Sequence, residues 1–514
     1  MKSHLLFSFL LISIIVNAQV PEDALRYSFY PQNGTARNMA IGGAMGSLGG
    51  DVTATFVNPA GLGLYRTNEF VITPSFIFNN NKANFRDTES KNKKNAFGLG
   101  TTGWVFGHTN NNNPRNSSAF SIAFVQSANF NNITKYNGLN DYSSFGEQFA
   151  EEFAKSGLTI NEVLNTNSPY PYTSAPALYT YLIDTVTVNG IVQVKAAPEY
   201  ILDAGQALSQ QMLKTTKGGL YDFAVGYAYN SGDKLYIGAS IDIPLVNYES
   251  NTVFTESDTS TNNANHFNKF EYTDNFTTKG TGLNAKLGVI YKPKDFIRLG
   301  LAIHTPTWMF LTDTRTTTLT TQVENPVQTF SVSSQTFTNS QPGEAKYIQR
   351  TPFKAIISGA YVFREISDVT KQKGFISADI EYVHHKGSRF SSDNETVTDN
   401  EKNYYKALNN VVKADYKGNF NFRVGGELKF NIIMARLGFA YYGNPYKDAG
   451  YKANRMLLSG GLGYRNKGFF VDLTYVYAIT KDVNFPYRLQ DRANTYASLK
   501  ENRGNVVATL GLKF

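Results

Sequence analysis

Residues 420–430 read FNFRVGGELKF, and this stretch decides the fold class. One face of an extended chain would carry the apolar side chains Phe420, Phe422, Val424, Leu428 and Phe430. The opposite face would carry Asn421, Arg423, Glu427 and Lys429. Because successive side chains of a β-strand point to opposite faces, the stretch predicts a strand with one apolar face. Such a face is buried in a sandwich core or turned toward lipid in a membrane barrel.

The same alternation recurs along the chain, and the lengths of the connections separate these two architectures. We predict fourteen strands, at 68–78, 95–107, 117–131, 219–230, 234–248, 279–292, 296–310, 347–363, 373–388, 417–430, 432–442, 455–465, 468–479 and 504–514. Connections after even-numbered strands are short, and long ones follow odd-numbered strands, at 79–94, 132–218, 249–278, 311–346, 389–416, 443–454 and 480–503. Short turns at one end and longer loops at the other are typical of bacterial outer-membrane barrels. The sequence therefore predicts an all-β protein, a fourteen-stranded antiparallel transmembrane β-barrel.

The N-terminal residues have the composition of a secretory signal peptide. Lys2 precedes an apolar run at 5–16, and Ala18 supplies a small residue before Gln19. This pattern predicts a signal peptide at 1–18. The run is shorter than the ~20 apolar residues that a spanning helix needs, and no longer run follows it. A membrane location would therefore require a closed barrel, since in lipid only helices and closed barrels satisfy every backbone polar group.

The composition argues against several classes of function. The 514 residues contain no cysteine, which excludes a thiol nucleophile and cysteine-ligated zinc. The net charge of +8 is spread along the chain, so we expect no nucleic-acid partner. His384 and His385 would point to opposite faces of a strand and could not chelate one metal ion. We find no serine–histidine–acid arrangement, and expect no enzyme, no catalytic residue, no cofactor and no metal.

Residues 19–67 do not alternate and are rich in small residues. They contain ARNMAIGGA at 36–44, with Gly42 and Gly43, and FVNPAGL at 56–62, with Asn58, Pro59, Ala60 and Gly61. Glycine permits tight turns and close backbone approach, and proline fixes the backbone angle φ. Such a compact, irregular segment fits inside a barrel lumen. We therefore expect 19–67 to form a hatch that plugs the barrel formed by 68–514, with these glycines and the Asn58–Gly61 turn as the gating residues.

These two motifs, separated by Asp51 and followed by a long antiparallel barrel, resemble the FadL/TodX family of outer-membrane transport proteins. The resemblance covers the mature chain in architecture but only residues 35–64 in motif. It implies a fourteen-stranded barrel with an N-terminal hatch, passive uptake of long-chain fatty acids and other hydrophobic molecules, and lateral release into the membrane through a kink in the third strand. The chain is also similar to exported proteins of the Bacteroidota, which are Gram-negative.

The resemblance also sets the expected partners and the alternatives. We expect a monomer in the cell outer membrane, with a hydrophobic ligand and membrane lipid as partners. The apolar last strand ends on Phe514, which resembles the signal read by the barrel-assembly machinery. One alternative is a shuttle or interaction module in type IX protein secretion, a role that the Bacteroidota give to a member of this family. A general pore is a further alternative.

Several residues are candidates for the ligand path. The kink would lie at 128–136, which places Phe130 beside it. Within 132–218, expected to be an extracellular region with short helices, Phe145 and Phe149 recur at helical spacing in 142–158, and a second helix is expected over 200–213. These helices would either close the loops over the barrel or form the mouth through which a ligand passes. His304 falls on the lumen face, where it would contact a ligand or be satisfied by the protein. The motif GLGTTG at 98–103 matches a dinucleotide-binding pattern but lies in a predicted strand with no helix after it.

Overall fold

The computed structural model describes residues 23–188, 190–324, 326–363 and 373–514. The predicted signal peptide at 1–18 lies outside these residues. No helix within the described ranges is long and apolar enough to cross a membrane. The motif GLGTTG at 98–103 lies where one strand ends, at Leu99, and the next begins, at Thr102. The next element after these strands is another strand, so no helix follows the motif.

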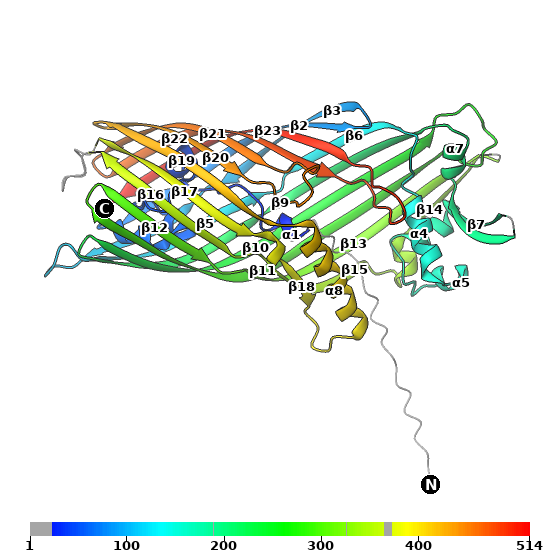
Figure 1. Ribbon diagram of the computed structural model, residues 1–514, viewed down its shortest axis with the longest axis horizontal. Coiled ribbons are helices and arrows are strands. Elements are labelled where there is room, and N and C mark those ends of the chain that lie inside the picture. The colour runs from blue at the N-terminus through cyan, green and yellow to red at the C-terminus, as the bar shows by residue number, and fades with distance from the viewer. Residues whose placement is uncertain (1–22, 189, 325, 364–372) are drawn as a thin grey trace, which may run out of the picture.

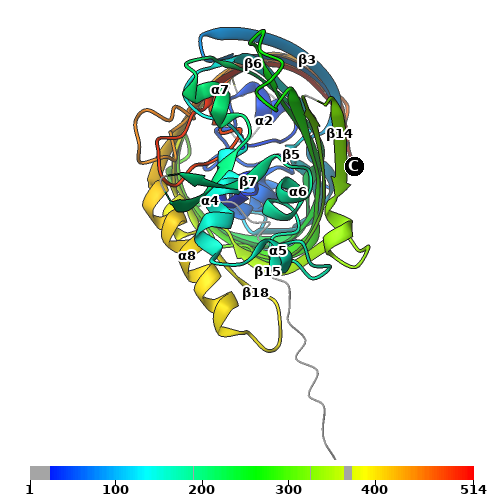
Figure 2. The ribbon, with the colours of Figure 1, turned by 90° about the vertical axis from the view of Figure 1, so that its right-hand side faces the viewer.

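The described residues form a closed barrel of fourteen antiparallel strands, counting each interrupted strand once (Figures 1 and 2). Each strand pairs with the next, and β23 pairs back to β1 and β2, which closes the sheet. The fold class predicted from the alternating segments is thus confirmed. In chain order the strands are β1 (Glu69–Ile72) with β2 (Pro74–Phe85), β3 (Thr88–Leu99) with β4 (Thr102–Thr109), β5 (Ser117–Asn129) with β6 (Asn132–Asn140), β9 (Leu208–Ser231), β10 (Leu235–Asp258), β11 (Lys269–Lys294), β12 (Ile297–His304) with β13 (Trp308–Val323), β15 (Gly343–Arg350) with β16 (Lys354–Phe363), β17 (Gly374–His384) with β18 (Arg389–Ser392), β19 (Gly418–Phe430), β20 (Ile433–Tyr442), β21 (Arg455–Asn466), β22 (Phe469–Asn484) and β23 (Ala497–Lys513).

A belt of exposed apolar side chains surrounds the half of the barrel that holds the short turns. On β10 the outward side chains from Leu235 to Leu245 are mostly aliphatic, and those from Asn247 to Asn251 are polar. A lipid-facing band flanked by aromatic residues is the outer surface of a membrane barrel. Members of this apolar belt include Phe97, Trp104, Phe106, Phe223, Tyr227, Ile237, Ile241, Leu245, Leu287, Leu301, Ile357, Ile380, Phe422, Leu437, Leu458, Leu473 and Leu510.

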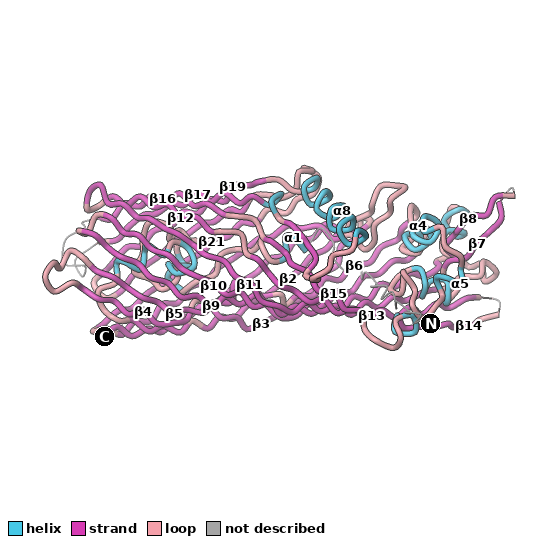
Figure 3. The backbone as a smooth tube through the Cα atoms, turned by 90° about the horizontal axis from the view of Figure 1, so that it is seen from below, coloured by secondary structure: helices cyan, strands magenta, loops and turns pink. Residues whose placement is uncertain are grey.

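Many strands continue well beyond the apolar belt (Figure 3). The connection predicted at 249–278 is mostly strand, because β10 and β11 stay paired as far as Ser257 and Lys269. Beyond the belt the outer face of a strand meets water, while inward side chains such as Phe254, Phe270 and Tyr272 stay buried. The continuous apolar outer face that marks a membrane strand is therefore lost, although the backbone ladder goes on. The strand bounds were therefore predicted too short at this end.

Loops cover the same end of the barrel. They hold the helices α4 (Glu147–Ser156), α5 (Ile160–Val163), α6 (Ser174–Tyr179) and α7 (Glu199–Asp203), the hairpin of β7 (Ile183–Val188) and β8 (Ile191–Ala196), and β14 (Gln328–Ser333) with η2 (Ser334–Phe337). Another loop, with η4 (His385–Gly387) and α8 (Asp399–Asp415), lies outside the wall in Figure 2.

The helix predicted over 200–213 is wrong. Helix α7 ends at Asp203, and Leu208 already begins β9. The apolar residues that suggested a helix, Ile201, Ala204, Leu208 and Met212, are spaced by three or four positions. A spacing of four fits the period of a helix and, being even, also keeps two side chains on one face of a strand. The pattern alone therefore could not separate the two.

Candidate functional site

Residues 23–67, here called the hatch, lie inside the barrel (Figure 2). Their short helices are α1 (Asp23–Arg26), α2 (Ala36–Ala40), α3 (Ala54–Val57) and η1 (Pro59–Leu64). The wall contacts them directly: the Thr474 hydroxyl donates to the Ala36 carbonyl at 2.7 Å, and the Ser459 hydroxyl donates to the Ala40 carbonyl at 3.0 Å. The hatch therefore fills the lumen at the level of the apolar belt.

The Asn58–Pro59 turn joins the hatch to itself and to the wall. Asn58 accepts from the Ala60 amide at 3.1 Å and donates to the Gly46 carbonyl at 2.6 Å. The same side-chain amide lies 3.3 Å from the Val289 carbonyl on β11. Since Asn58 is 1% exposed, these bonds satisfy a group that would be costly to bury alone.

Glycines of the wall let the hatch approach closely. A Cβ at Gly288 would overlap the Asn58 side-chain amide, and a Cβ at Gly238 would overlap the Pro59 backbone. On the opposite wall, a Cβ at Gly438 would overlap the Gly42 backbone. The two predicted gating motifs, at Gly42 and at Asn58–Pro59, thus lie directly against glycines of the wall, where no wall side chain separates them from the backbone. The hatch residues of these contacts could be predicted from the sequence, but the glycines of the wall could not.

Buried ion pairs also connect the hatch to the wall. The Arg37 guanidinium of α2 lies 3.5 Å from a carboxylate oxygen of Glu427 on β19. Glu427 lies 2.6 Å from Arg436, which in turn lies 2.5 Å from Asp472. Removing one partner of such a chain leaves an uncompensated buried charge, which is strongly destabilising. Sequence reasoning placed Glu427 on the lumen face but did not find its partner in the hatch.

His304 contacts the hatch rather than the main cavity. Its Nε2 lies 2.8 Å from the Val57 carbonyl, next to the Asn58–Pro59 turn. It borders a small cavity of about 110 Å³ that is also lined by Asp222, Lys286 and Glu381. This environment is polar and charged, so His304 is positioned to hold the hatch.

A cavity of about 750 Å³, here called the main cavity, lies between the hatch and the loops. The hatch side chains Leu25, Phe29 and Tyr30 line it from one side. Phe130, at the break between β5 and β6, lines it as well and packs edge-on against Tyr248 with ring centroids 5.5 Å apart. Pockets of several hundred cubic ångströms with mostly apolar walls are typical of small-molecule sites.

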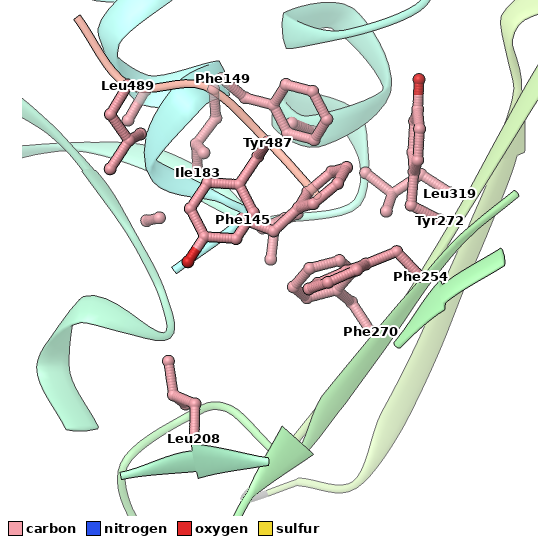
Figure 4. Close-up of a cluster of buried hydrophobic side chains, with 14 of the residues drawn as sticks. Phe145, Phe149, Ile183, Leu208, Phe254, Phe270, Tyr272, Leu319, Tyr487 and Leu489 are labelled. Atoms are coloured by element: carbon pink, nitrogen blue, oxygen red, sulfur yellow. The ribbon is translucent and has the colours of Figure 1, made fainter. Parts of the chain in front are cut away.

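Aromatic side chains from the loops and from the outer parts of β10 and β11 pack into one cluster (Figure 4), and several of them line the cavity. The Phe145 ring stacks on Phe254 at 4.4 Å and contacts Tyr272 and Tyr487 at 5.3 and 5.7 Å. Phe149, one helical turn on, lies 5.6 Å from Tyr272. Phe145 and Phe149 both line the cavity, and both belong to this cluster, here called the cap. They therefore combine loop packing with lining of the cavity.

Polar contacts anchor the cap to the barrel. Glu256, at the outer end of β10, accepts from the Phe145 amide at 3.1 Å and from the Gln210 side chain at 2.6 Å. Glu147 accepts from the Ser144 amide at 2.7 Å. Burial raises the pKa of Glu256 and the pKa of Glu147, each to about 7. Both groups lie outside the apolar belt, so the cap depends on two carboxyls that titrate near neutral pH.

The cavity carries basic side chains next to its aromatic ones. Arg26 is paired with Asp23 at 2.6 Å, and Arg315 is paired with Asp274 at 2.9 Å. Arg455, on β21, lies over the Phe29 ring at 4.3 Å, and its Nε is buried without a hydrogen-bond partner within the described part of the chain. A guanidinium offers a planar set of donors that suits a carboxylate. The cavity can thus accept an apolar body with an anionic end.

The wall of the cavity is interrupted between β3 and the strand formed by β5 and β6. In the described ranges β3 forms a backbone ladder only with β2, and β6 forms one only with β9. The register of β5 against β9 shifts between Gln126 and Ala128, just before the break at 130–131. We call this unpaired line between β3 and β6 the seam. The kink expected at 128–136 coincides with it.

Among the described residues, the hydrogen bonds that bridge the seam are donated by side chains. The Asn129 side chain donates to the Phe97 carbonyl at 2.8 Å, and Asn92 donates to the Lys135 carbonyl at 3.2 Å. Gly98, on the inner side of β3, and residues 126–132 line the cavity. The cavity thus reaches the seam, which begins at the upper edge of the apolar belt, beside the exposed Phe97 ring. Side-chain bonds across a seam can be exchanged without breaking a strand ladder.

Comparisons with known proteins agree on the fold. No protein-family model matches the sequence, and neither does any curated protein. Among solved structures, the Pseudomonas putida toluene transporter TodX superposes with a TM-score of 0.52 and 13% identity over 94% of this chain and 99% of that one. The fold is that of the FadL/TodX transporters. The Ralstonia pickettii toluene transporter TbuX gives 0.51 and 16% over 95% and 100%, and a Pseudomonas aeruginosa FadL homologue gives 0.50 and 13% over 94% and 99%.

The likeness covers the whole described architecture rather than one motif. The expectation of a barrel like those of the FadL/TodX family is therefore confirmed for the fold. TodX and TbuX are toluene transporters, and at such low identity the likeness carries over their architecture alone.

Proposed function

We propose that the protein is an outer-membrane channel for the passive uptake of hydrophobic small molecules. The observation that carries the proposal is a cavity of about 750 Å³ that is capped by aromatic rings, floored by the hatch and open to the seam. An apolar belt around the barrel supports a membrane location. Binding and release along this path involve no covalent step, so we propose a transporter and not an enzyme.

The proposed ligand is an amphiphile with a long apolar chain and a carboxylate, such as a long-chain fatty acid. Burial of a sixteen-carbon chain is favourable by about 12 kcal/mol, at about 0.8 kcal/mol per CH2. Phe130, Phe145 and Phe149 offer apolar contact to that chain. Arg455 lies where the headgroup would bind. A neutral hydrocarbon would use the same rings but would form no charge-assisted hydrogen bond with the guanidinium.

The proposed exit is the seam, with the hatch as its gate. Returning the ligand to water would cost the free energy gained on binding, whereas release into lipid would not. The hatch blocks the straight route through the lumen with its Asn58–Pro59 turn and its Arg37–Glu427 ion pair. A small shift of Phe29 and Tyr30 at the cavity floor would move the ligand toward Phe130 and the seam.

Ligand binding to the purified full-length protein tests this proposal. Palmitate should bind saturably, and mass spectrometry should detect co-purified acyl lipid. A protein that carries no acyl lipid and binds no palmitate, but captures a secreted protein, would support the secretion shuttle instead. Ion conductance of planar bilayers without any lipid binding would support a general pore.

A further inference from the structure

Four lysines stand in one row on the outer surface of the barrel. Lys91 of β3 is the register partner of Lys82 of β2, Lys82 is the partner of Lys500 of β23, and Lys500 is the partner of Lys481 of β22. Directly opposite residues of neighbouring strands point to the same face, and neighbouring strands lie about 4.8 Å apart. We call these residues the lysine row.

The lysine row runs parallel to the edge of the apolar belt. Phe78 and Tyr477 belong to the last aromatic row of the belt on these strands, since both are register partners of Gly504. Lys82 follows Phe78 by four residues, about 13 Å along the strand and about 9 Å along the membrane normal for a strand tilted by about 45°. Lysine side chains extend toward a lipid interface from such positions. The row is thus placed at the level of lipid headgroups.

In the part of the chain that the structure describes, the protein offsets the positive charges at only one end of the lysine row. Glu89 lies 3.1 Å from the Lys91 ammonium and 3.8 Å from that of Lys82. Neither Lys481 nor Lys500 has an ion pair within the described residues, and Lys93, one row closer to the belt, adds to the positive charge. Like charges at directly opposite positions of a sheet destabilise it. An external anion beside Lys481 and Lys500 would remove that repulsion.

We propose that the lysine row binds the phosphate-bearing headgroup of an outer-leaflet lipid. The inference rests on the membrane location that is part of the proposed function, but not on uptake. A lipid fits better than a free anion, because the row is linear, parallel to the belt and placed above a lipid-facing aromatic row. The row ends at Lys91 on β3, the strand that borders the seam. A bound lipid would therefore hold one side of the seam at a fixed height in the membrane.

Lipid retention by the full-length protein in detergent tests this proposal. Native mass spectrometry would compare added phosphatidylglycerol, the anionic probe, with phosphatidylcholine. Wild type should retain the anionic lipid preferentially. Because each basic residue near a charged surface contributes about 1 kcal/mol, loss of the row should weaken that retention by at least about tenfold. The test variant carries K82Q, K91Q, K481Q and K500Q.

Two further variants make the result specific. A control with four exposed lysines replaced, none of which lies directly opposite another lysine, should retain the lipid like wild type, and a row of four arginines should restore what glutamine removes. The control carries K217Q, K269Q, K279Q and K346Q.

Three results would overturn the proposal. The first is that the row variant and the control lose the lipid equally. The second is that wild type retains phosphatidylglycerol and phosphatidylcholine equally. The third is that inorganic phosphate at the same concentration displaces the lipid. Failure of palmitate binding with intact retention of phosphatidylglycerol would count against the uptake function alone.

Discussion

Replacing Arg455 with glutamine should weaken the binding of a fatty acid far more than that of the matching alcohol. Arg455 lies over Phe29 at 4.3 Å in the main cavity, and its buried Nε has no hydrogen-bond partner within the described residues. A carboxylate placed there would form charge-assisted hydrogen bonds, worth about 1.5–3 kcal/mol. At 1.4 kcal/mol per factor of ten, R455Q should weaken palmitate binding by about 10- to 100-fold. Hexadecanol buries the same chain without the charge and should lose less than about threefold.

The assay is calorimetry or displacement of a fluorescent fatty acid from the purified protein, with both ligands on both proteins. The ratio of the two affinity changes isolates the headgroup contact, since any general loosening of the cavity affects both ligands. Lys279→Gln, on the outer face, removes the same charge outside the cavity and should change neither affinity. The reasoning is refuted if palmitate and hexadecanol weaken by the same factor.

Three further predictions concern the hatch and the cap. Gly288→Ala should destabilise the protein by about 1–3 kcal/mol and expose the hatch to limited proteolysis, because the added methyl overlaps the hatch, whereas Gly359→Ala, with nothing within 4 Å, should be neutral. Phe145→Ala should cost about 3–5 kcal/mol of cap stability and speed cleavage in the loops, and unchanged cleavage would contradict the packing described. Burial raises the pKa of Glu256 from 4.5 to about 7, so the folded cap binds more protons than the open one. Cap stability should therefore be highest below pH about 4.5, fall as the pH rises to about 7 and stay flat above. Hydrogen exchange of the cap, corrected for intrinsic rates, should show this slope in wild type and a smaller one in E256Q, where Glu147 remains.

The strands inside the belt were predictable, and those beyond it were not. Within the belt, lipid on one side and a packed lumen on the other force apolar and polar side chains to alternate, as at Phe420, Phe422 and Val424. Above the belt, water replaces lipid, and β10 continues past Leu245 with polar residues outward. Backbone hydrogen bonds between neighbouring strands hold that part together, and these bonds do not require apolar and polar side chains to alternate.

The hatch motifs were predictable as a buried turn, but their partners were not. Asn58 and Pro59 indicate a fixed turn in any context, because one side chain bonds nearby backbone and the other fixes φ. That Gly238 and Gly288 receive this turn depends on the height at which the hatch sits in the barrel. Glycine in a strand can also mark a bulge or a bend, so only the three-dimensional structure shows which of these roles a given glycine has.

A kink at 128–136 was expected from the family resemblance and from the end of the alternation near Phe130, but the unpaired line between β3 and β6 was not. Its side-chain bridges were not predictable, since asparagines such as Asn92 and Asn129 are typical of solvated loops. The ion pair between Arg37 and Glu427 joins residues far apart in sequence, and nothing in a single sequence couples them.

A reversible covalent bridge across the seam tests the central claim most directly. The Ser90 hydroxyl lies 3.1 Å from the side-chain oxygen of Asn137 on the other side of the seam, and the chain has no cysteine of its own. The variant S90C/N137C would be oxidised, with loss of free thiols as the check that the bridge has formed. Palmitate uptake into cells or vesicles should fall to background when the bridge is closed and return on reduction, while palmitate binding to the cavity persists. Full uptake through the bridged seam would contradict lateral release.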